Sequence, residues 1–273
     1  MHPVILYREG YSNERERRAA EAHFDVYTHR SIIPKGSLVI GRYSVIPFYA
    51  ELCVDLVVTG SEPINSASQH RYIADLGNWY RDLQGLTPET WTELDAVPDD
   101  AWPCVLKGET NSRKWQWKTA MFAADRAAGI EVRERLQQDG LLCDQHIYFR
   151  RFVKLAPVHP EGGAIISGPP VSREFRFFVC DGQVLSAGFY WSMFDRDDID
   201  PYPDPAEVPQ SLLAEVIGRV GKNARFYVID VAQTANGDWI VVELNEGQMS
   251  GLSDNDPDVL YRRLKEVIGP VGG

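Results

Sequence analysis

The sequence predicts an α+β protein of two domains. Its length, a change in composition along the chain and the pattern of its strands all support that prediction. The chain has 273 residues, which suits one large domain or two modest domains of about 150 residues each. Near residues 98–103 a polar, helical stretch gives way to apolar strands. We therefore expect a small α/β domain at residues 1–102 and a larger domain at residues 103–273 in which strands and helices are mixed.

Composition and charge narrow the class of protein. Hydrophobic residues make up 44% of the chain and charged residues 25%, as in a folded globular protein. The formal net charge, 28 basic minus 39 acidic residues, is −11. Because binding to the phosphates of nucleic acid needs a basic surface, we expect no nucleic-acid partner. The acidic balance favours a cationic or zwitterionic acceptor substrate.

Cysteine usage and hydropathy indicate a reduced compartment. No pair of cysteines has the CxxC spacing of a zinc ribbon, because the four lie far apart, at Cys53, Cys104, Cys143 and Cys180. The first residues are too polar for a secretory signal, and the apolar run at 52–58 is interrupted by Asp55 and too short to span a membrane. We expect a cytoplasmic protein without a membrane partner.

Apolar runs and turn signals place the expected elements in order. In the first domain we expect strands at 4–7, 37–42 and 53–59, a helix at 12–22 with Ser12 as N-cap, and polar helices within 61–102. In the second domain we expect strands at 103–107, 117–122, 147–155, 174–180, 184–191, 226–232 and 239–245, and helices at 125–138, 210–219 and 257–268. Residues 195–209 are rich in Asp and Pro and are expected to form an exposed loop.

The last two strands carry the most informative pattern. The pair Asn236-Gly237 between two apolar runs is a strong hairpin signal, and a hairpin there places Asp230 near Glu243 across the two strands. Asn245 shares a face with Glu243 because the two are separated by one residue. Buried carboxylates are costly unless they are paired or bound to metal, and oxygen donors suit Mg²⁺. The alternative is that both acids lie on the solvated face of an edge hairpin.

This arrangement, followed by Glu-Gly-Gln-Met-Ser, resembles the metal-binding signature of the ATP-grasp superfamily of carboxylate–amine and carboxylate–thiol ligases. The resemblance implies the ATP-grasp fold, in which two α/β subdomains clasp ATP, here preceded by a small α/β N-terminal substrate domain. It also implies ATP and Mg²⁺ as cofactors, with two ions expected and Mn²⁺ able to substitute. In the family the matching residues, here Asp230, Glu243 and Asn245, hold the metal between the ATP phosphates.

A second motif is the strand that ends in Lys107. The run Pro-Cys-Val-Leu-Lys resembles the family strand whose lysine reaches the α- and β-phosphates, a role that suits a compact ammonium. Residues 108–114 lie where the family keeps a loop over the phosphates. This loop is polar rather than rich in glycine, and the preceding domain offers Arg71 in place of a lysine, so that the resemblance is to a divergent branch. The alternative for Lys107 is a solvated lysine at a strand end.

Two further motifs follow in the family's order. The strand at 147–155 resembles the segment whose backbone hydrogen-bonds adenine, which implies nucleotide contacts at Arg151, Phe152 and Val153. A pair between Arg151 and a carboxylate is an equally good interpretation of that arginine. Glu174 and Arg176 alternate with phenylalanines and so share one face; they resemble the family's acid-x-arginine pair, with Glu174 at the nucleotide and Arg176 on the transferred phosphate. A cross-strand ion pair is the alternative.

Candidate substrate contacts follow the metal signature. The small residues Gly247, Ser250 and Gly251 resemble the family loop that approaches the carboxylate substrate. Arg42, after an apolar strand, has the charge to bind a carboxylate, although a surface role is the commoner one for such an arginine. Four aromatic residues are candidates for the pocket wall, although aromatic residues at strand spacing more often lie in a core: Trp115, Trp117, Tyr190 and Trp191.

The resemblance implies an ATP-dependent ligase that joins a carboxylate to an amine through an acyl phosphate and releases ADP and phosphate. Lys107 and Arg176 are the expected catalytic residues, and an amino acid, a peptide or a protein terminus is the expected substrate. One alternative is a non-catalytic Mg-ATP-binding regulatory protein with the same fold. Another is a phosphotransferase, but the histidines form no phospho-carrier motif. Family members are often dimers, so the resemblance also allows a homodimer.

Overall fold

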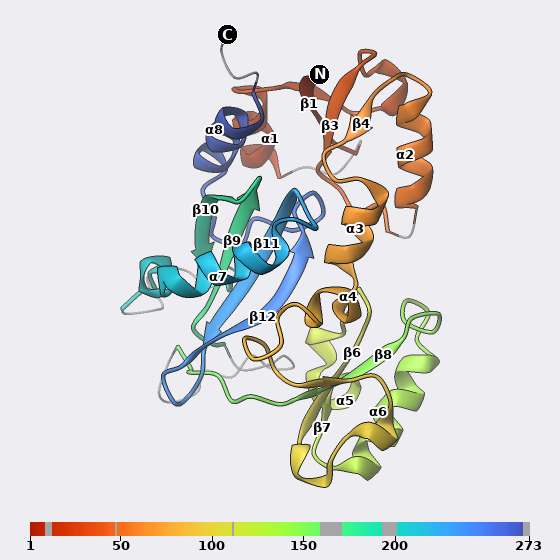
Figure 1. Cartoon of the computed structure of the whole chain (residues 1–273), viewed down its shortest axis with the longest axis vertical. Coiled ribbons are helices and arrows are strands. Elements are labelled where there is room, and N and C mark those ends of the chain that lie inside the picture. Colours follow the sequence, from red (N-terminus) through yellow and green to blue (C-terminus); the bar gives the residue numbers. More distant parts are fainter. Residues whose placement is uncertain (9–12, 47, 111, 159–170, 193–200, 270–273) are drawn as a thin grey trace.

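Three four-stranded sheets organise the molecule, which we describe from a computed structural model (Figure 1). The structure describes residues 1–8, 13–46, 48–110, 112–158, 171–192 and 201–269. The first sheet lies near the N-terminus, the second and largest lies in the middle of the molecule, and the third and smallest lies at the opposite end (Figure 1). The chain therefore combines strands and helices in every part, as the α+β prediction requires.

The N-terminal sheet is parallel, with strand order β2-β1-β3-β4. Its strands are β1 (His2–Leu6), β2 (Asp25–Tyr27), β3 (Ser37–Gly41) and β4 (Glu62–Pro63). The helical elements of this region are α1 (Glu14–Glu21), η1 (Arg30–Ile32), α2 (Tyr49–Val57), α3 (Ala67–Ala74) and α4 (Leu76–Tyr80). Asn13 caps α1 by accepting a hydrogen bond from the Glu16 N–H; the expected cap, Ser12, lies outside the described residues.

The expected strand at 53–59 was wrong, because this segment is largely the helix α2. Tyr49, Leu52 and Leu56 are buried at helical spacing, whereas Val54 and Val57 point outward. The valines dominated the pattern, but β-branched residues tolerate a helix when buried side chains recur every three or four positions. Tertiary packing of one face therefore outweighed β-propensity here.

The smallest sheet is antiparallel, with strand order β5-β8-β6-β7. Its strands are β5 (Thr90–Trp91), β6 (Cys104–Gly108), β7 (Phe122–Ala123) and β8 (Ile147–Arg151), and its helical elements are η2 (Leu94–Ala96), η3 (Asp99–Ala101), η4 (Lys114–Gln116), α5 (Trp117–Ala120) and α6 (Arg126–Gln137). Strand β5 precedes the expected domain boundary after residue 102 and yet pairs with β8. The expected strand at 117–122 was wrong in its first part, which forms α5.

The largest sheet is antiparallel, with strand order β10-β9-β11-β12. Its strands are β9 (Glu174–Cys180), β10 (Gln183–Phe189), β11 (Phe226–Gln233) and β12 (Trp239–Glu246). The sequence predicted all four to within two residues at each end. Gly237 adopts a φ of +91° in the turn between β11 and β12, which confirms the hairpin expected from Asn236-Gly237.

Both faces of this sheet are covered. On one face, side chains of α3, α4 and α7 (Gln210–Val220) form a core with β9, β11 and β12. On the other face, α1, α8 (Pro257–Ile268) and strands of the N-terminal sheet form a second core. The helices at 210–219 and 257–268 are thereby confirmed, and the helix at 125–138 is confirmed as α6, which packs with the smallest sheet. The loop expected at 195–209 contains η6 (Pro205–Glu207), and its first six residues lie outside the described ranges.

One glycine of β10 sets how closely the segment before α8 approaches the sheet. A Cβ built on Gly188 would lie 2.4 Å from the carbonyl carbon of Asp254 and 2.5 Å from the backbone nitrogen of Asn255. The Asn255 side chain in turn donates to the Arg176 backbone oxygen at 3.2 Å. Gly188 therefore lets this segment lie directly on the sheet.

We predict that Gly188→Ala lowers the free energy of unfolding by about 2 kcal/mol, because the added methyl group forces two backbone segments apart. Thermal unfolding should show a Tm about 4–8 °C lower. Gly218→Ala is the matched control, since Gly218 lies exposed in α7 with no atom within 4 Å of a built Cβ, and alanine favours a helix. Equal Tm values for both variants would contradict the close approach.

Candidate active site

Four residues form a row across the largest sheet. Gly188 of β10 pairs with Arg176 of β9, Arg176 pairs with Asp230 of β11, and Asp230 pairs with Glu243 of β12. Three of the residues expected to act on phosphate or metal are thus direct cross-strand neighbours, 67 residues apart along the chain from Arg176 to Glu243. Side chains paired in this way share a face.

Arg176 and Asp230 form a buried, two-pronged ion pair. Arg176 Nε and Nη2 donate to the two carboxylate oxygens of Asp230, each at 2.8 Å, and Nη1 donates to the Gly251 carbonyl at 2.8 Å. Asp230 has no exposed surface. Burial disfavours the Arg176 cation, but the pair with Asp230 outweighs it and raises the arginine pKa. Asn245 adds a hydrogen bond from Nδ2 to Asp230 Oδ2 at 3.0 Å.

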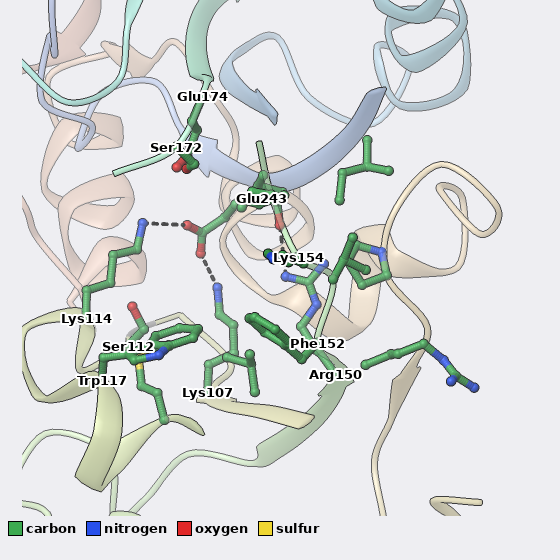
Figure 2. Close-up of a pocket in the computed structure, with 18 of the residues that line it drawn as sticks. Lys107, Ser112, Lys114, Trp117, Arg150, Phe152, Lys154, Ser172, Glu174 and Glu243 are labelled. Atoms are coloured by element: carbon green, nitrogen blue, oxygen red, sulfur yellow. Dashed lines mark hydrogen bonds and ion pairs between the residues drawn. The ribbon is translucent and has the colours of Figure 1, made fainter. Parts of the chain in front are cut away.

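Glu243 is held by two lysines from the smallest sheet and its loop. Lys107, in β6, donates to Glu243 Oε1, and the Lys114 ammonium, in η4, lies 3.7 Å from Oε2. Figure 2 shows the carboxylate between the two ammonium groups. Burial opposes its ionisation, but the two lysines outweigh that effect and lower the pKa of Glu243. The contact joins two sheets through charge.

A register shift between Asp230 and Val231 turns Glu243 towards this contact. The partner of Asp230 is Glu243, whereas the partner of Val231 is Val241, so that Val242 is the extra residue of a bulge. Val241 can then lie in the core while Val242 and Glu243 border the pocket. Bulges re-aim side chains in this manner and are frequent beside functional sites.

A pocket of about 240 Å³ lies between the smallest and largest sheets. Its charged lining residues are Lys107, Lys114, Arg150, Arg151, Lys154, Glu174 and Glu243. Its apolar lining residues are Pro88, Val105, Trp117, Met121, Phe152, Val153, Leu155, Pro157, Val171, Trp191, Ile240 and Val242. A flat apolar slot that leads to several cations suits a ligand with an aromatic base at one end and anionic groups at the other.

The expected metal ligands form a donor set that fits magnesium. Two carboxylates, Asp230 and Glu243, pair across the hairpin, and the amide of Asn245 adjoins Asp230. Hard oxygen donors of this kind, close to cations that can share a polyphosphate, are what Mg²⁺ prefers. In the described part of the chain no group of three His, Cys, Asp or Glu side chains gathers to hold a metal.

The segment expected to contact adenine borders the apolar slot. Phe152 donates its backbone N–H to Pro103 O at 2.9 Å, whereas in the described residues the backbone of Val153 makes no hydrogen bond. Arg151 also borders the pocket, but its guanidinium donates to Glu89 Oε2 at 2.6 Å and to the Asp100 carbonyl at 3.0 Å. The arginine–carboxylate pair is therefore the arrangement that the structure has for this side chain.

Glu174 is a buried carboxyl with an unused oxygen in the pocket. Its Oε1 has no hydrogen-bond partner among the described residues. Burial raises the pKa of Glu174 to about 7, Lys114 opposes the rise, and Asp230 adds to it. Figure 2 places Glu174 beside Ser172, on the far side of Glu243 from Lys107. An unpaired acceptor in this position suits hydroxyl donors of a bound ligand.

Of the residues expected to contact substrate, three make internal contacts and one is exposed. Arg42 uses all its N–H groups internally, on Glu16 Oε1 at 2.8 Å and on the carbonyls of Gly247, Gln248 and Ser250. Its position therefore corrects the expectation of a free guanidinium: it clamps the loop after β12. Gly247 packs on Phe226, where a Cβ would lie 2.9 Å from the ring, and the Ser250 hydroxyl donates to Glu246 O at 2.9 Å. Gly251 is exposed, with open space beside it.

Three site residues received no firm role from the sequence. Lys114 lies in the polar loop, to which the sequence assigns no individual contact. Arg150 donates to the Val242 carbonyl at 2.8 Å and to Thr87 Oγ1 at 2.7 Å. Because side chains alternate along β8, it is Arg150, and not Arg151, that shares a face with Lys107. Tyr190 has the strand spacing of a core aromatic residue. Alternation along the strand was the signal that would have found Arg150.

Comparison with known protein families identifies the class. A family model described as an ATP-grasp domain, the third family of its clade, matches residues 95–264. The match spans well over half of the chain, and the fold agrees with it. This protein belongs to the ATP-grasp family. A comparison with curated proteins gives no match.

Solved structures show the same fold over nearly the whole chain. A RimK domain ATP-grasp protein from Sphaerobacter thermophilus DSM 20745 is 17% identical, with a TM-score of 0.57 over 95% of this chain and 98% of that one. The D-cycloserine synthetase DcsG is 16% identical, with a TM-score of 0.58 over 97% and 99%. The ATP-grasp ligase PsnB, solved with a minimal precursor, is 12% identical, with a TM-score of 0.58 over 97% and 99%.

A search of the described residues for membrane spans finds no helix with the length and hydropathy to cross a bilayer.

The raised pKa of Glu174 predicts a pH-dependent stability. Because the folded-state pKa of about 7 exceeds the ordinary value of 4.5, the folded protein binds this proton more tightly than the unfolded chain. Stability relative to Glu174→Gln is therefore greatest below about pH 4.5, and it falls as the pH rises to about 7. Between pH 5 and pH 8 we expect a relative loss of about 2 kcal/mol in denaturant unfolding.

Glu134→Gln, at an exposed position of α6, is the control for loss of a carboxyl. Its stability relative to the wild type should stay level across the same pH range. A level curve for Glu174→Gln as well would contradict the buried, unpaired environment of that side chain.

Proposed function

We propose that the protein is an ATP-dependent ligase that joins a carboxylate to an amine through an acyl phosphate, with release of ADP and phosphate. One observation carries the proposal. The carboxylate of Glu243, on the largest sheet, lies between two lysines from the other side of the pocket, Lys107 and Lys114, and its cross-strand neighbour Asp230 pairs with Arg176. Phosphoryl transfer depends on positioning and charge neutralisation of this kind rather than on a protein nucleophile.

The apolar slot suits the base of the nucleotide, and the charged residues suit its phosphates. The slot beside Phe152 and Val153 suits the adenine ring, with the backbone groups of Val153, which have no partner among the described residues, as hydrogen-bonding partners. Glu174 suits hydroxyl groups of the nucleotide, because its buried Oε1 is an unused acceptor. Lys107 then lies at the phosphates, where a compact ammonium acts as a point charge.

Asp230, Glu243 and Asn245 are the residues that would hold Mg²⁺, which supplies neutralising charge to phosphate oxygens when bound. Lys107 contacts the carboxylate of Glu243 from the wall of the pocket that the smallest sheet forms. It therefore reaches the phosphates from the side opposite to Glu243. Arg176 carries its charge on the face of the sheet where the transferred group develops negative charge, and its pair with Asp230 fixes the direction of the guanidinium.

The proposed reaction has two steps. A substrate carboxylate oxygen attacks the γ-phosphorus of ATP, the bond to the bridging oxygen breaks, and ADP leaves with the electron pair. The amine nitrogen then attacks the acyl carbon, phosphate leaves, and the proton of the amine passes to solvent. Arg176 and Lys107 neutralise the charge that builds up on the transferred phosphoryl group.

The substrate side of the site lies towards the N-terminal region. Gly251 is exposed next to Arg176, from whose Nη1 its carbonyl accepts a hydrogen bond, and Arg42 ties the preceding loop to residues 1–102. We propose that residues 1–102 select the substrate and that residues 103–273 carry the chemistry. PsnB and the macrocyclase MdnC were solved with precursor peptides, which supports a peptide, an amino acid or a protein terminus as the substrate here.

We predict that Mg-ATP with pooled amino acids, dipeptides and short peptides releases ADP in a substrate-dependent manner. Glu243→Ala should lower this release by at least about 100-fold, because it removes a carboxylate from the proposed metal site. The measurement is coupled ADP release by the wild type and the variant, with equilibrium binding of Mg-ATP measured in parallel.

Asp238→Asn is the matched control, since it removes a carboxylate from the exposed turn of the same hairpin; its activity should stay within twofold of the wild type. Binding of Mg-ATP without ADP release from any pool would favour a regulatory protein with this fold. Failure to bind Mg-ATP would contradict the proposed function.

A further inference from the structure

Tyr190 lies between two cations of the site. It follows β10 directly, and its ring centroid is 4.6 Å from Lys114 Nζ and 4.8 Å from Arg176 Cζ. Lys114 also donates a hydrogen bond to the Tyr190 hydroxyl at 2.6 Å. An aromatic ring attracts cations to its face, so that this one side chain contacts both charges.

The two cations reach Tyr190 from different parts of the fold. Lys114 belongs to η4, in the part of the chain that carries the smallest sheet, whereas Arg176 belongs to β9 of the largest sheet. The ammonium of Lys114 lies between the Tyr190 hydroxyl and Glu243 Oε2, which is 3.7 Å away. Tyr190 thereby ties the lysine at the end of the polar loop to the largest sheet.

The hydroxyl distinguishes this tyrosine from a core residue. In the described part of the chain Lys114 is the partner of that hydroxyl, so phenylalanine would fill the same space and lose only this contact. The next residue, Trp191, is 4% exposed and packs in the core beneath the sheet. Tyr190 is only partly buried, as is typical of a side chain that faces a site.

We propose that Tyr190 is a positioning residue that holds Lys114 and Arg176 on two sides of the phosphate-transfer site. This rests on the proposed function, since it concerns how the same site places its charges. The hydroxyl directs the lysine, which would otherwise be a long and mobile side chain, and the ring keeps two like charges apart while it stabilises both.

The test is a double-mutant cycle on the full chain, with binding of Mg²⁺ and the non-hydrolysable ATP analogue AMPPNP as the readout. We expect Tyr190→Phe to weaken binding about tenfold, because it removes a charge-assisted hydrogen bond that orients Lys114. Lys114→Met should weaken binding at least as much. The double variant should bind no more weakly than Lys114→Met, because the hydroxyl acts through the lysine.

Tyr72→Phe is the matched control. It removes a hydroxyl that donates to Asp82 at 2.5 Å, outside the pocket, and AMPPNP affinity should stay within twofold of the wild type. Provided that the wild type binds AMPPNP, two results would overturn the positioning role and leave the proposed function standing. One is an unchanged affinity of Tyr190→Phe. The other is a double variant whose loss of affinity equals the product of the two single losses. Absence of binding by the wild type would overturn both.

Discussion

Two hydrogen bonds of 2.8 Å join the guanidinium of Arg176 to both carboxylate oxygens of Asp230, whose side chain is fully buried. Loss of one partner from such a pair typically costs about 3–5 kcal/mol, because the other charge stays buried and unpaired. Both residues of the pair make further hydrogen bonds. Asp230 accepts from Asn245, and Arg176 holds the carbonyl of Gly251. The placement of Asn245 and of the Gly251 carbonyl therefore depends on this pair.

A second set of buried contacts ties the N-terminal region to the end of β12. Glu246 follows Asn245 directly, and its Oε1 accepts from Asn65 Nδ2 at 2.7 Å while Oε2 lies 3.0 Å from His70 Nδ1. Asn65 also accepts from the backbone N–H of Phe226, at the start of β11. Together with the clamp formed by Arg42, these contacts hold the loop after β12 from the side where a substrate would enter.

The sequence predicted what local spacing determines. Alternation and one turn signal were enough to place Asp230, Glu243 and Asn245 together, because a tight hairpin brings its own strands into register. The family resemblance, by contrast, pointed to Arg151 on β8, although its neighbour Arg150 is the one that shares the face of Lys107. The choice depends on which face β8 turns towards Lys107, and the register of β6 with β8, in which Lys107 pairs with Tyr148, determines that face.

Contacts between segments far apart in the chain could not be predicted from the spacing of residues. Arg42 is 205 positions from the carbonyl of Gly247 that it binds, and Lys114 is 76 positions from Tyr190. A guanidinium after an apolar strand has the same local pattern whether it meets a ligand or a backbone carbonyl. The ATP-grasp resemblance supplied the missing long-range order for the sheets, but not for residues outside its motifs.

The pairing of β5 with β8 has a consequence for how this architecture can vary. Thr90 lies opposite Arg150, so the chain enters and leaves the smallest sheet at adjacent positions. A unit whose two ends are neighbours can be lengthened, shortened or exchanged without displacing the rest of the chain. Residues 90–152 are in this sense a cassette, and changes in the loop above the pocket can accumulate there while the charged row on the largest sheet stays in place.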